Sequence, residues 1–422
     1  MLTLFLAKRS YKPHAPSEDK GKRRGASSSA IGIATAGVAV GLAVMLITIC
    51  VVKGFQSEVQ NTITGFASHI EVMDPRSYAT PEAYPLVTSK QIVDEVKQAP
   101  GVVHVQRMSE KMGIFKTEND FTGMCLKGVA SSDYDLSFLR AHIVEGQMPE
   151  FRDDTASNRI VISRLTAEKM GLKVGSKVYT YFFERTIKQR LFHVAAIYDT
   201  HMHQFDDTFV ITDLYTVNRL NSWMTDQSSG LEVRLSSMDD IPAAHLWLNK
   251  HLGQKRDRNG NTYATTNIYE NFRTASVLSW LRLLDFNIVV ILVIMMCVSG
   301  FTMVSGLLIL ILERTSTIGI LKALGATNAT MRHTFLWYAS LIVVRGMVWG
   351  NVIGLGLAAL QHYTGLFHLD PASYYVDAVP VEFNWLWIIG INIVTLIITM
   401  LALIIPSFLV STVQPAKAIQ FD

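Results

Sequence analysis

The segment HMHQFDD, residues 201–207, is the densest group of side chains in this sequence that could hold a metal ion. His201 and His203 would share one face of a strand, and imidazole and carboxylate groups bind zinc. Asp206 and Asp207 follow them, but no cysteine or fourth ligand at metal-binding spacing accompanies the group. We therefore interpret the segment as a solvated loop between two strands and expect no metal site.

The motifs of nucleotide binding and covalent catalysis do not occur in the sequence. The string GLKVGSKV, residues 171–178, is the nearest approach to the phosphate loop G-x-x-x-x-G-K-[ST], and its spacing is wrong. No G-x-S-x-G elbow marks a nucleophilic serine. We predict a chain that is not an enzyme and binds neither a nucleotide nor another cofactor.

Four long apolar stretches predict transmembrane helices. Residues 286–312 carry no charged side chain, and residues 334–360 carry only Arg345. Residues 30–52 and 385–410 complete the set. Each stretch is as long as the roughly 20 apolar residues that cross a hydrocarbon core. The first is also longer than the apolar core of a signal peptide, so we interpret it as an anchor.

Lysine and arginine gather on one side of these spans. Seven of them precede residue 30 and three lie in residues 313–333, whereas residues 361–384 have none. The bias toward cytoplasmic loops places both termini and residues 313–333 in the cytoplasm. The expected organisation is a basic cytoplasmic arm (1–29), transmembrane helix 1 (30–52), a periplasmic domain with a connecting helix (53–285), transmembrane helix 2 (286–312), a cytoplasmic coupling segment (313–333), transmembrane helix 3 (334–360), a periplasmic loop (361–384), transmembrane helix 4 (385–410) and a cytoplasmic tail (411–422).

The long segment between the first two spans predicts a large α+β domain. SHIEVM alternates like a strand, SKQIVDEVKQA has helical periodicity, and two apolar runs form a hairpin around residues 118–120. Strand, helix and strand recur in RIVISRLTAEKMGLKVGSKVYTYFF, and the polar stretch HLGQKRDRNGNTYATTN marks the exit of the domain. Cys125 is its only cysteine, so a packed core must stabilise it instead of disulfides.

The composition argues against nucleic-acid binding. The chain is 49% hydrophobic and 17% charged, and its net charge of +3 is concentrated in the cytoplasmic flanks. Arg345 lies inside the third span, where an unpaired charge costs at least ~2.5 kcal/mol. It must reach the interface, face a polar cavity or pair with another group.

Glycine spacing predicts close helix packing in two spans. Small residues on one stripe let helices approach closely in lipid, either within the chain, which we favour, or at a dimer interface. The stripes are Gly37 and Gly41 in the first span, and Gly346, Gly350 and Gly354 in the third.

The segment 313–333 is short, amphipathic and basic, as expected of a docking site for a cytoplasmic partner. Ile320, Leu321 and Leu324 recur at helical spacing, Gly325 can end these turns, and Thr327 can begin the next helix. The alternative is a turn that lies on lipid headgroups.

The sequence of this segment, ERTSTIGILKALGAT, resembles the signature loop of FtsX/MacB-type permeases, the membrane subunits of ABC systems that act as mechanical transmitters. FLAKRSYKP, VVKGFQSEVQNTITGFASHIEV, YYVDAVPVEFNW and PAKAIQFD narrow the resemblance to the lipoprotein-releasing LolC/LolE branch. Two features depart from the pattern. Thr317 stands where the family usually has an acidic residue, and the hairpin TYFFERTIKQRLFHV is shorter than in members that pass lipoprotein to a periplasmic chaperone.

The resemblance implies a permease subunit of the bacterial inner membrane that extracts lipoproteins from the outer leaflet by ATP-driven mechanotransmission. Its implied partners are a LolD-like ABC ATPase dimer that binds ATP and Mg, a second permease copy or paralogue, acylated lipoprotein, membrane lipid and a periplasmic lipoprotein chaperone. The alternatives are a MacB-like efflux permease and an FtsX-like signalling protein that activates a cell-wall hydrolase.

The resemblance also assigns candidate residues to three surfaces. The ATPase-coupling residues are Ile318, Ile320, Leu321, Lys322, Leu324, Gly325 and Thr327. The residues expected to line an apolar substrate cavity between the first two spans are Val40, Val44, Ile47, Met295, Phe301 and Met303. The basic residues of the hairpin expected to meet a periplasmic partner are Arg185, Lys188 and Arg190.

Overall fold

A computed structural model describes residues 24–80, 82–117, 120–130, 135–152, 154–183, 186–370 and 374–408. The chain divides into two compact units. The helical unit consists of Met1–Ser57, Arg282–His368 and Ala378–Asp422, and the α+β unit consists of Glu58–Leu281 with Leu369–Asp377. The tail 411–422 and most of the arm 1–29 lie outside the described residues.

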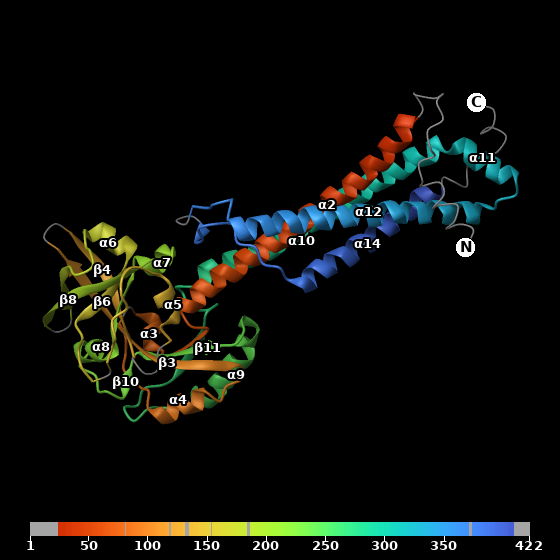
Figure 1. Ribbon diagram of the computed structural model, residues 1–422. Coiled ribbons are helices and arrows are strands. Elements are labelled where there is room, and N and C mark those ends of the chain that lie inside the picture. Colours follow the sequence, from red (N-terminus) through yellow and green to blue (C-terminus); the bar gives the residue numbers. More distant parts are fainter. Residues whose placement is uncertain are drawn as a thin grey trace. The chain divides into compact units, whose positions relative to one another are not determined.

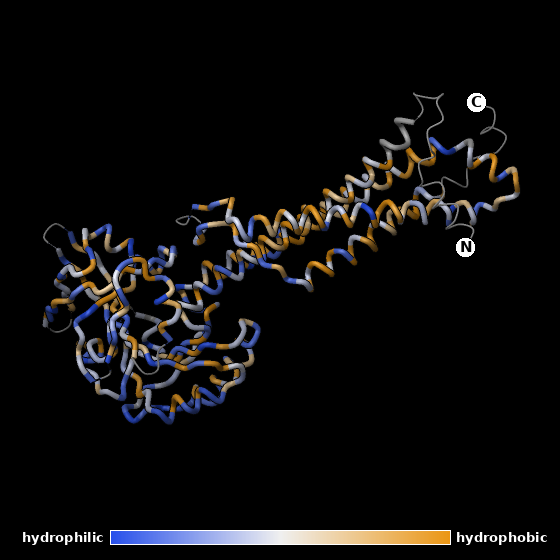
Figure 2. The backbone as a smooth tube through the Cα atoms, in the orientation of Figure 1, coloured by the Kyte–Doolittle hydropathy of each residue, from blue (hydrophilic) through white to orange (hydrophobic). Residues whose placement is uncertain are grey.

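Within the described residues, four helices are long and apolar enough to cross a membrane (Figure 1). The tube in Figure 2 is predominantly hydrophobic along these helices. This confirms the prediction of four transmembrane helices and a large intervening domain. The helices are α2 (Arg24–Phe66), α10 (Ala275–Glu313), α12 (Asn328–Thr364) and α14 (Trp385–Ser407), and the short α11 (Thr315–Ala323) joins α10 to α12.

Three of these helices are longer than the apolar stretches that predicted them. α2 continues past residue 52 through the polar sequence KGFQSEVQNTITGF, and α10 begins before residue 286. α12 begins at Asn328, where the Thr327 side chain accepts a hydrogen bond from the Thr330 N–H. Hydropathy locates only the part of a helix that fits the hydrocarbon, whereas the helix itself continues until its backbone finds a cap.

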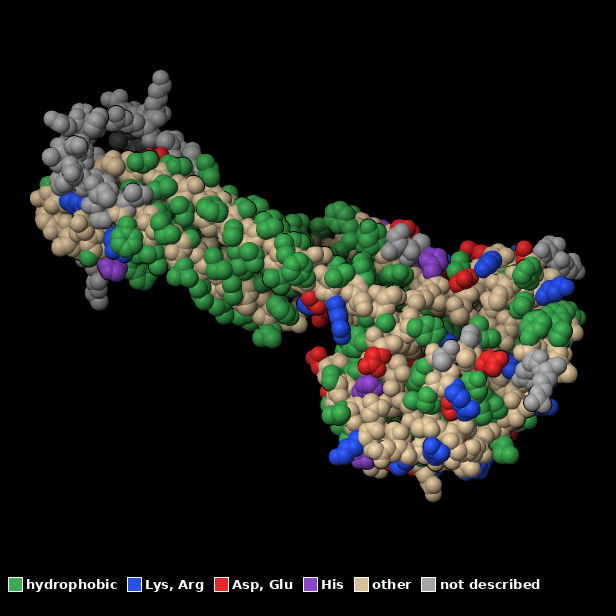
Figure 3. Space-filling model, turned by 180° about the vertical axis from the view of Figure 1, so that it is seen from behind, with side chains coloured by type: hydrophobic (Ala, Val, Ile, Leu, Met, Phe, Trp, Pro, Cys, Tyr) green, Lys and Arg blue, Asp and Glu red, His purple; other side chains and the backbone are tan. Residues whose placement is uncertain are grey.

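Apolar side chains fill the contacts between helices in the helical unit. Leu42, Leu46 and Ile49 of α2 pack in one cluster with Ile388 and Ile391 of α14. Other apolar side chains cover the outer surface of these helices, whereas charged side chains are spread over the α+β unit (Figure 3). A surface of this kind is compatible with lipid, since lipid tails are as apolar as leucine.

A ten-stranded sheet is the centre of the α+β unit in the described residues. Its strand order is β12-β1-β11-β3-β4-β9-β6-β8-β5, and β7 pairs with β3 and β8. The strands are β1 (Ile70–Met73), β3 (Val102–Lys116), β4 (Phe121–Val129), β5 (Ile143–Gly146), β6 (Arg159–Ser163), β7 (Lys177–Phe183), β8 (Ile187–Tyr198), β9 (Phe209–Asp213), β11 (Gly230–Leu235) and β12 (Ala264–Asn267), and the short β2 (Leu86–Val87) pairs with β10 (Gln227–Ser228).

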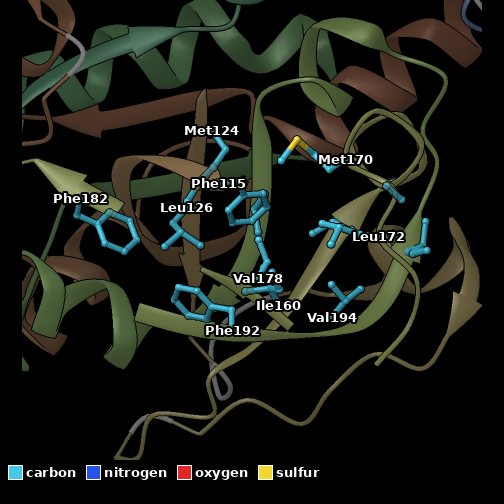
Figure 4. Packing of buried hydrophobic residues seen from close by; sticks show 14 of the residues in the cluster. Phe115, Met124, Leu126, Ile160, Met170, Leu172, Val178, Phe182, Phe192 and Val194 are labelled. Carbon is cyan, nitrogen blue, oxygen red and sulfur yellow. The ribbon is translucent and has the colours of Figure 1, made fainter. Parts of the chain in front are cut away.

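Short helices cover the sheet and close the core. Figure 4 shows Phe115 of β3, Phe182 of β7 and Phe192 of β8 packed with aliphatic side chains of the same cluster. The predicted hairpin is present, with Lys116 of β3 paired to Phe121 of β4. The helices of this unit are α3 (Arg76–Ala79), α4 (Lys90–Val96), α5 (Ser137–Ala141), α6 (Arg164–Met170), α7 (His203–Asp206), α8 (Leu214–Leu220) and α9 (Ile241–Leu252).

One prediction for this unit was wrong in part. The HMHQFDD segment connects the strands β8 and β9 as expected, but it is not fully solvated. Its residues His203–Asp206 form α7, and the Asp206 side chain is buried and accepts a hydrogen bond from Thr200 Oγ1 at 2.7 Å. The exit stretch contains the edge strand β12, which pairs with β1. Both elements were difficult to recognise in the sequence because their residues are mostly polar. A buried carboxylate is stabilised by hydrogen bonds, and a strand at the edge of a sheet does not require a run of apolar residues.

Candidate functional site

The loop between α10 and α12 presents a small apolar surface from a well-defined turn. Ile318 is only 1% exposed and packs with Met331 and Phe335 of α12 in the core of the helical unit. Leu321 packs against the same core. Ile320 and Leu324 point away from it, and Leu324 is 80% exposed.

These exposures correct the sequence interpretation of one apolar face. Ile318 and Leu321 hold α11 on the helical unit, whereas Ile320 and Leu324 are available to a partner. Thr317 is also exposed on α11, and Lys322 is half-buried. A docking surface on this segment would therefore be centred on Ile320 and Leu324.

The turn after α11 is formed as the sequence predicted. Gly325 adopts a φ of +95°, a backbone conformation that favours glycine. Its N–H donates to the Lys322 carbonyl at 3.0 Å, and the Ala326 N–H donates to the Leu321 carbonyl at 3.0 Å. Thr327 then caps α12. This arrangement fixes the direction in which Leu324 projects.

The residues expected to line a substrate cavity do not share one environment. Val40 of α2 and Phe301 of α10 are 60% and 74% exposed, and Val44, Ile47 and Met295 are half-buried. Met303 is fully buried in the core of the helical unit, so it cannot line a cavity that is open in this chain. Residues two apart on a helix point roughly 200° apart, which explains why Phe301 and Met303 face different surroundings.

Both glycine stripes lie where helices of the same chain meet. A Cβ at Gly37 would lie 2.3 Å from Thr302 Cγ2, and one at Gly41 would lie 1.9 Å from Ser299 Oγ, both on α10. The stripe on α12 faces α2 in the same way. A Cβ added at Gly346 would lie 2.9 Å from Val38 Cβ. A Cβ at Gly350 would lie 2.9 Å from the Ala39 carbonyl oxygen, and one at Gly354 would lie 2.9 Å from Ala43 Cα.

An ion pair that the sequence analysis missed joins α2 to α10. Lys53 Nζ lies 2.8 Å from Asp285 Oδ1, and Gln56 Nε2 donates to the same oxygen at 3.2 Å. The Lys53 ammonium also lies 5.6 Å from the centre of the Trp387 ring. The signal was available, because Lys53 directly follows one predicted span and Asp285 directly precedes the next.

The basic hairpin offers fewer free charges than its sequence suggests. Lys188 Nζ donates to the Leu220 carbonyl at 2.8 Å and lies 3.2 Å from Ser222 Oγ. Arg190 is exposed on β8, and Arg185 lies outside the described residues. On α12 the structure places Arg345 at an exposed position.

Comparison with known protein families identifies this architecture. Residues 31–249, more than half of the chain, match the MacB-like periplasmic core domain. Residues 289–415 match the FtsX-like permease C-terminal family. The chain belongs to the FtsX/MacB-type permeases. This permease is a multi-pass membrane protein with a periplasmic domain between its first and second transmembrane helices, and its family lacks a nucleotide-binding domain.

The permease is distantly similar to curated proteins over nearly its full length. It is 20% identical to the lipoprotein-releasing system transmembrane protein LolC of Xylella fastidiosa over 96% of this chain and 97% of the relative. It is also 20% identical to LolE of Haemophilus influenzae, over 91% and 92% of the two chains.

Two solved structures are similar to about half of the permease. The periplasmic region of MacB from Actinobacillus actinomycetemcomitans is 11% identical with a TM-score of 0.34, covering 54% of the permease and 98% of that chain. The extracellular domain of the ABC-type transporter YknZ from Gram-positive bacteria is 18% identical with a TM-score of 0.32, covering 47% and 99%.

Proposed function

We propose that this permease is a subunit of an ABC transporter that extracts lipoproteins from the outer leaflet of the bacterial inner membrane. The proposal is carried by the similarity of this permease to LolC and LolE. The similarity extends over nearly the full length of this chain and of each relative. Similarity of this extent covers the coupling loop, the four helices and the periplasmic domain together.

The energy for extraction comes from a separate ATPase in this proposal. ATP and Mg bind to an ABC ATPase dimer, and each ATPase subunit receives the exposed Ile320 and Leu324 of a permease subunit in an apolar groove. A second copy of this chain or a paralogue completes the pair of permeases. Gly325 and Thr327 fix the turn that carries Leu324, so movement of the ATPase is passed to α10 and α12.

The acyl chains of the lipoprotein meet the exposed apolar surfaces of α2 and α10. Each methylene removed from the bilayer costs about 0.8 kcal/mol, so a receiving surface must be apolar over several residues. Val40 and Phe301 provide exposed surface, and Val44, Ile47 and Met295 are half-buried. On the other side of the membrane from the ATPase, the hairpin that carries Arg190 is our candidate contact for a periplasmic chaperone.

The proposal requires cytoplasmic termini and a cytoplasmic coupling loop. In a chain without its three native cysteines, a cysteine at the exposed Asn259 should react with a membrane-impermeant thiol reagent in intact cells. A cysteine at the exposed Asn328 should react only after the cells are opened. Reaction of both cysteines in intact cells would contradict the orientation.

Photocrosslinking tests the substrate class. A photoreactive residue at Phe301 should crosslink to triacylated lipoprotein in the complex with the ATPase, and excess lipoprotein should compete. Val352 on α12 is the matched control, because it is also apolar and 59% exposed but lies outside the proposed surface. Equal crosslinking to lipoprotein from both positions, or to phospholipid alone from Phe301, would contradict the proposal.

Efflux is the second candidate function, and the match to the MacB-like periplasmic core domain favours it. An efflux permease would release a soluble peptide or small molecule instead of a lipidated protein. In the same crosslinking experiment, competition at Phe301 by such a molecule and none by lipoprotein would support efflux.

A further inference from the structure

The last turn of α2 ends against the sheet of the α+β unit, where two cations meet its carbonyl groups. Lys127 of β4 donates from Nζ to the Phe66 carbonyl oxygen at 2.9 Å. Arg234 of β11 donates to the carbonyl oxygens of Thr64 and Gly65 at 3.5 and 3.4 Å. The last carbonyls of a helix lack partners within the helix and carry partial negative charge, so cations stabilise this end.

The segment that leads into α10 is held at the same place. Arg273, two residues before α10, makes two hydrogen bonds to the Glu110 carboxylate of β3, at 2.9 and 3.1 Å. The centre of the Phe209 ring lies 5.1 Å from the Arg273 guanidinium and 5.8 Å from the Lys127 ammonium. The end of α2 and the start of α10 therefore share one group of sheet residues.

The charges of this group do not balance. Lys127 pairs with Glu232 of β11 at 2.6 Å, and Glu71 of β1 is directly opposite Glu232 in the strand register. Glu71 accepts a hydrogen bond from Asn271 Nδ2 at 3.0 Å, an amide that brings no charge. Arg234 is neutralised by its ion pair with Asp135, so three carboxylates face the two remaining cations, Lys127 and Arg273. Glu71, Glu110, Lys127 and Glu232 are all buried. Like charges directly opposite each other on neighbouring strands destabilise a sheet, and an uncompensated buried charge is costly.

We propose that Glu71, Glu110, Lys127, Glu232 and Arg273 form a joint that positions the end of α2 and the start of α10 on the sheet, and that this joint is complete only when Glu71 carries a proton. One proton makes the group neutral. The titratable side chains that face Glu71 are Glu232 on β11, Glu110 on β3, Lys127 on β4, Arg273 before α10 and Tyr78 on α3.

The environments of Glu71 and Glu110 explain why Glu71, and not Glu110, takes up the proton. Burial and the neighbouring Glu232 carboxylate raise the pKa of Glu71 to about 7. Burial also opposes ionisation of Glu110, but the Arg273 guanidinium holds the pKa of that carboxyl below its usual value. A carboxyl whose pKa is raised in the folded state stabilises that state when it is protonated. For Glu71 this stabilisation is complete at pH values below the ordinary pKa of 4.5, and it is lost as the pH rises through about 7.

Hydrogen exchange of the full-length permease in detergent tests the joint. Exchange of amides near the end of α2 (residues 60–66) and the start of α10 (residues 275–280), corrected for intrinsic rates, should rise about tenfold per pH unit between roughly pH 5 and 7 and then level off. Glu71→Gln keeps the acceptor for Asn271 and cannot ionise, so its corrected exchange should not change with pH.

Asp206→Asn is the matched control. Burial raises the pKa of Asp206 to about 6 as well, but its side chain bonds to Thr200 and lies outside the joint. This variant should keep the pH dependence at the ends of α2 and α10. Corrected exchange that is the same at pH 5 and 7.5 in the unaltered permease, or that still rises in Glu71→Gln, would overturn the proposal.

Glu232→Gln supplies a second, charge-specific test if Glu71→Gln is poorly folded. This change leaves two carboxylates with two cations, so the joint no longer needs a proton. Glu71 stays buried but loses the repulsion of the Glu232 carboxylate, so the rise in exchange should shift to lower pH than in the unaltered permease. A rise over the same pH range as in the unaltered permease would contradict the charge balance. The exchange measurements use no substrate. A result that overturns the joint would therefore leave the proposed function untouched.

Discussion

Asn351 of α12 and Asn392 of α14 donate to each other across the helical unit. Asn351 Nδ2 lies 2.7 Å from Asn392 Oδ1, and Asn392 Nδ2 lies 3.0 Å from Asn351 Oδ1. Each amide also donates to a carbonyl of its own helix, at 2.8 Å for Met347 and 2.9 Å for Ile388. In a membrane, such a reciprocal pair fixes which residues of two apolar helices meet.

Replacing one asparagine of this pair by leucine should destabilise the permease by about 1–2 kcal/mol, because the remaining amide loses its partner in an apolar setting. The double variant Asn351→Leu/Asn392→Leu should recover part of that loss. Unfolding of the purified permease in mixed micelles measures the double-mutant cycle. Additive losses without recovery would show that the two side chains do not interact.

Gly350 and Gly356 of α12 provide a matched test of close helix packing. A Cβ at Gly350 would lie 2.9 Å from the Ala39 carbonyl oxygen of α2, whereas nothing lies within 4 Å of one at Gly356. Gly350→Ala should force α12 away from α2 and cost about 1–3 kcal/mol. Gly356→Ala should be neutral or stabilise by up to about 1 kcal/mol through helix propensity. Equal melting temperatures for the two variants would contradict this packing.

His69 should make the α+β unit sensitive to acid. Burial first, and then the nearby Arg234, lower the pKa of His69 to about 4. The Leu235 N–H donates a hydrogen bond to His69 Nδ1, with 3.3 Å between the two nitrogen atoms. His69 Nδ1 must be unprotonated to accept this hydrogen bond. Because the pKa of His69 in the folded state lies below the ordinary value near 6.5, the neutral imidazole stabilises the folded unit above pH 6.5. This stabilisation, about 3 kcal/mol in total, is lost as the pH falls to about 4.

His69→Asn keeps an acceptor at a similar position and should remove much of this acid dependence. The exposed His193→Asn is the control and should retain it. The measurement is protection of β11 amides against hydrogen exchange in the full chain between pH 4 and 7. Acid dependence of equal size in both variants would assign it to other groups.

Leu324→Asp tests the coupling surface. Leu324 is exposed in the isolated chain, so the variant should insert and fold normally but lose copurification with the ATPase, because a charge would enter an apolar groove. Asn328→Asp adds the same charge in the same loop, at the beginning of α12 where an acid is favourable, and should still copurify. Normal copurification of Leu324→Asp would indicate that the segment only lies on lipid.

The transmembrane helices and the break at Gly325 could be predicted from sequence because their signals are local. Hydropathy over one segment finds a span, and a glycine followed by Thr327 ends one helix and begins another. The hairpin between Lys116 and Phe121 is local for the same reason.

The orientations of single side chains could not be predicted because they depend on contacts distant in sequence. Leu321 and Leu324 are both apolar and one turn apart, but only Leu321 packs on the core of the helical unit. Similarly, Glu71 alternates with Ile70 and Val72 as a solvent-facing residue would, but all of β1 is buried. Lys127, which meets the end of α2, is 105 residues from its partner Glu232.

Reconstituted release of lipoprotein is the most direct test of the proposed function. The permease, with its second subunit and ATPase, would be placed in proteoliposomes that carry a triacylated lipoprotein. We expect ATP to transfer the lipoprotein to a soluble acceptor, and we expect Leu324→Asp to abolish this transfer. Active ATP hydrolysis by the assembled complex with no lipoprotein leaving the membrane would contradict the account.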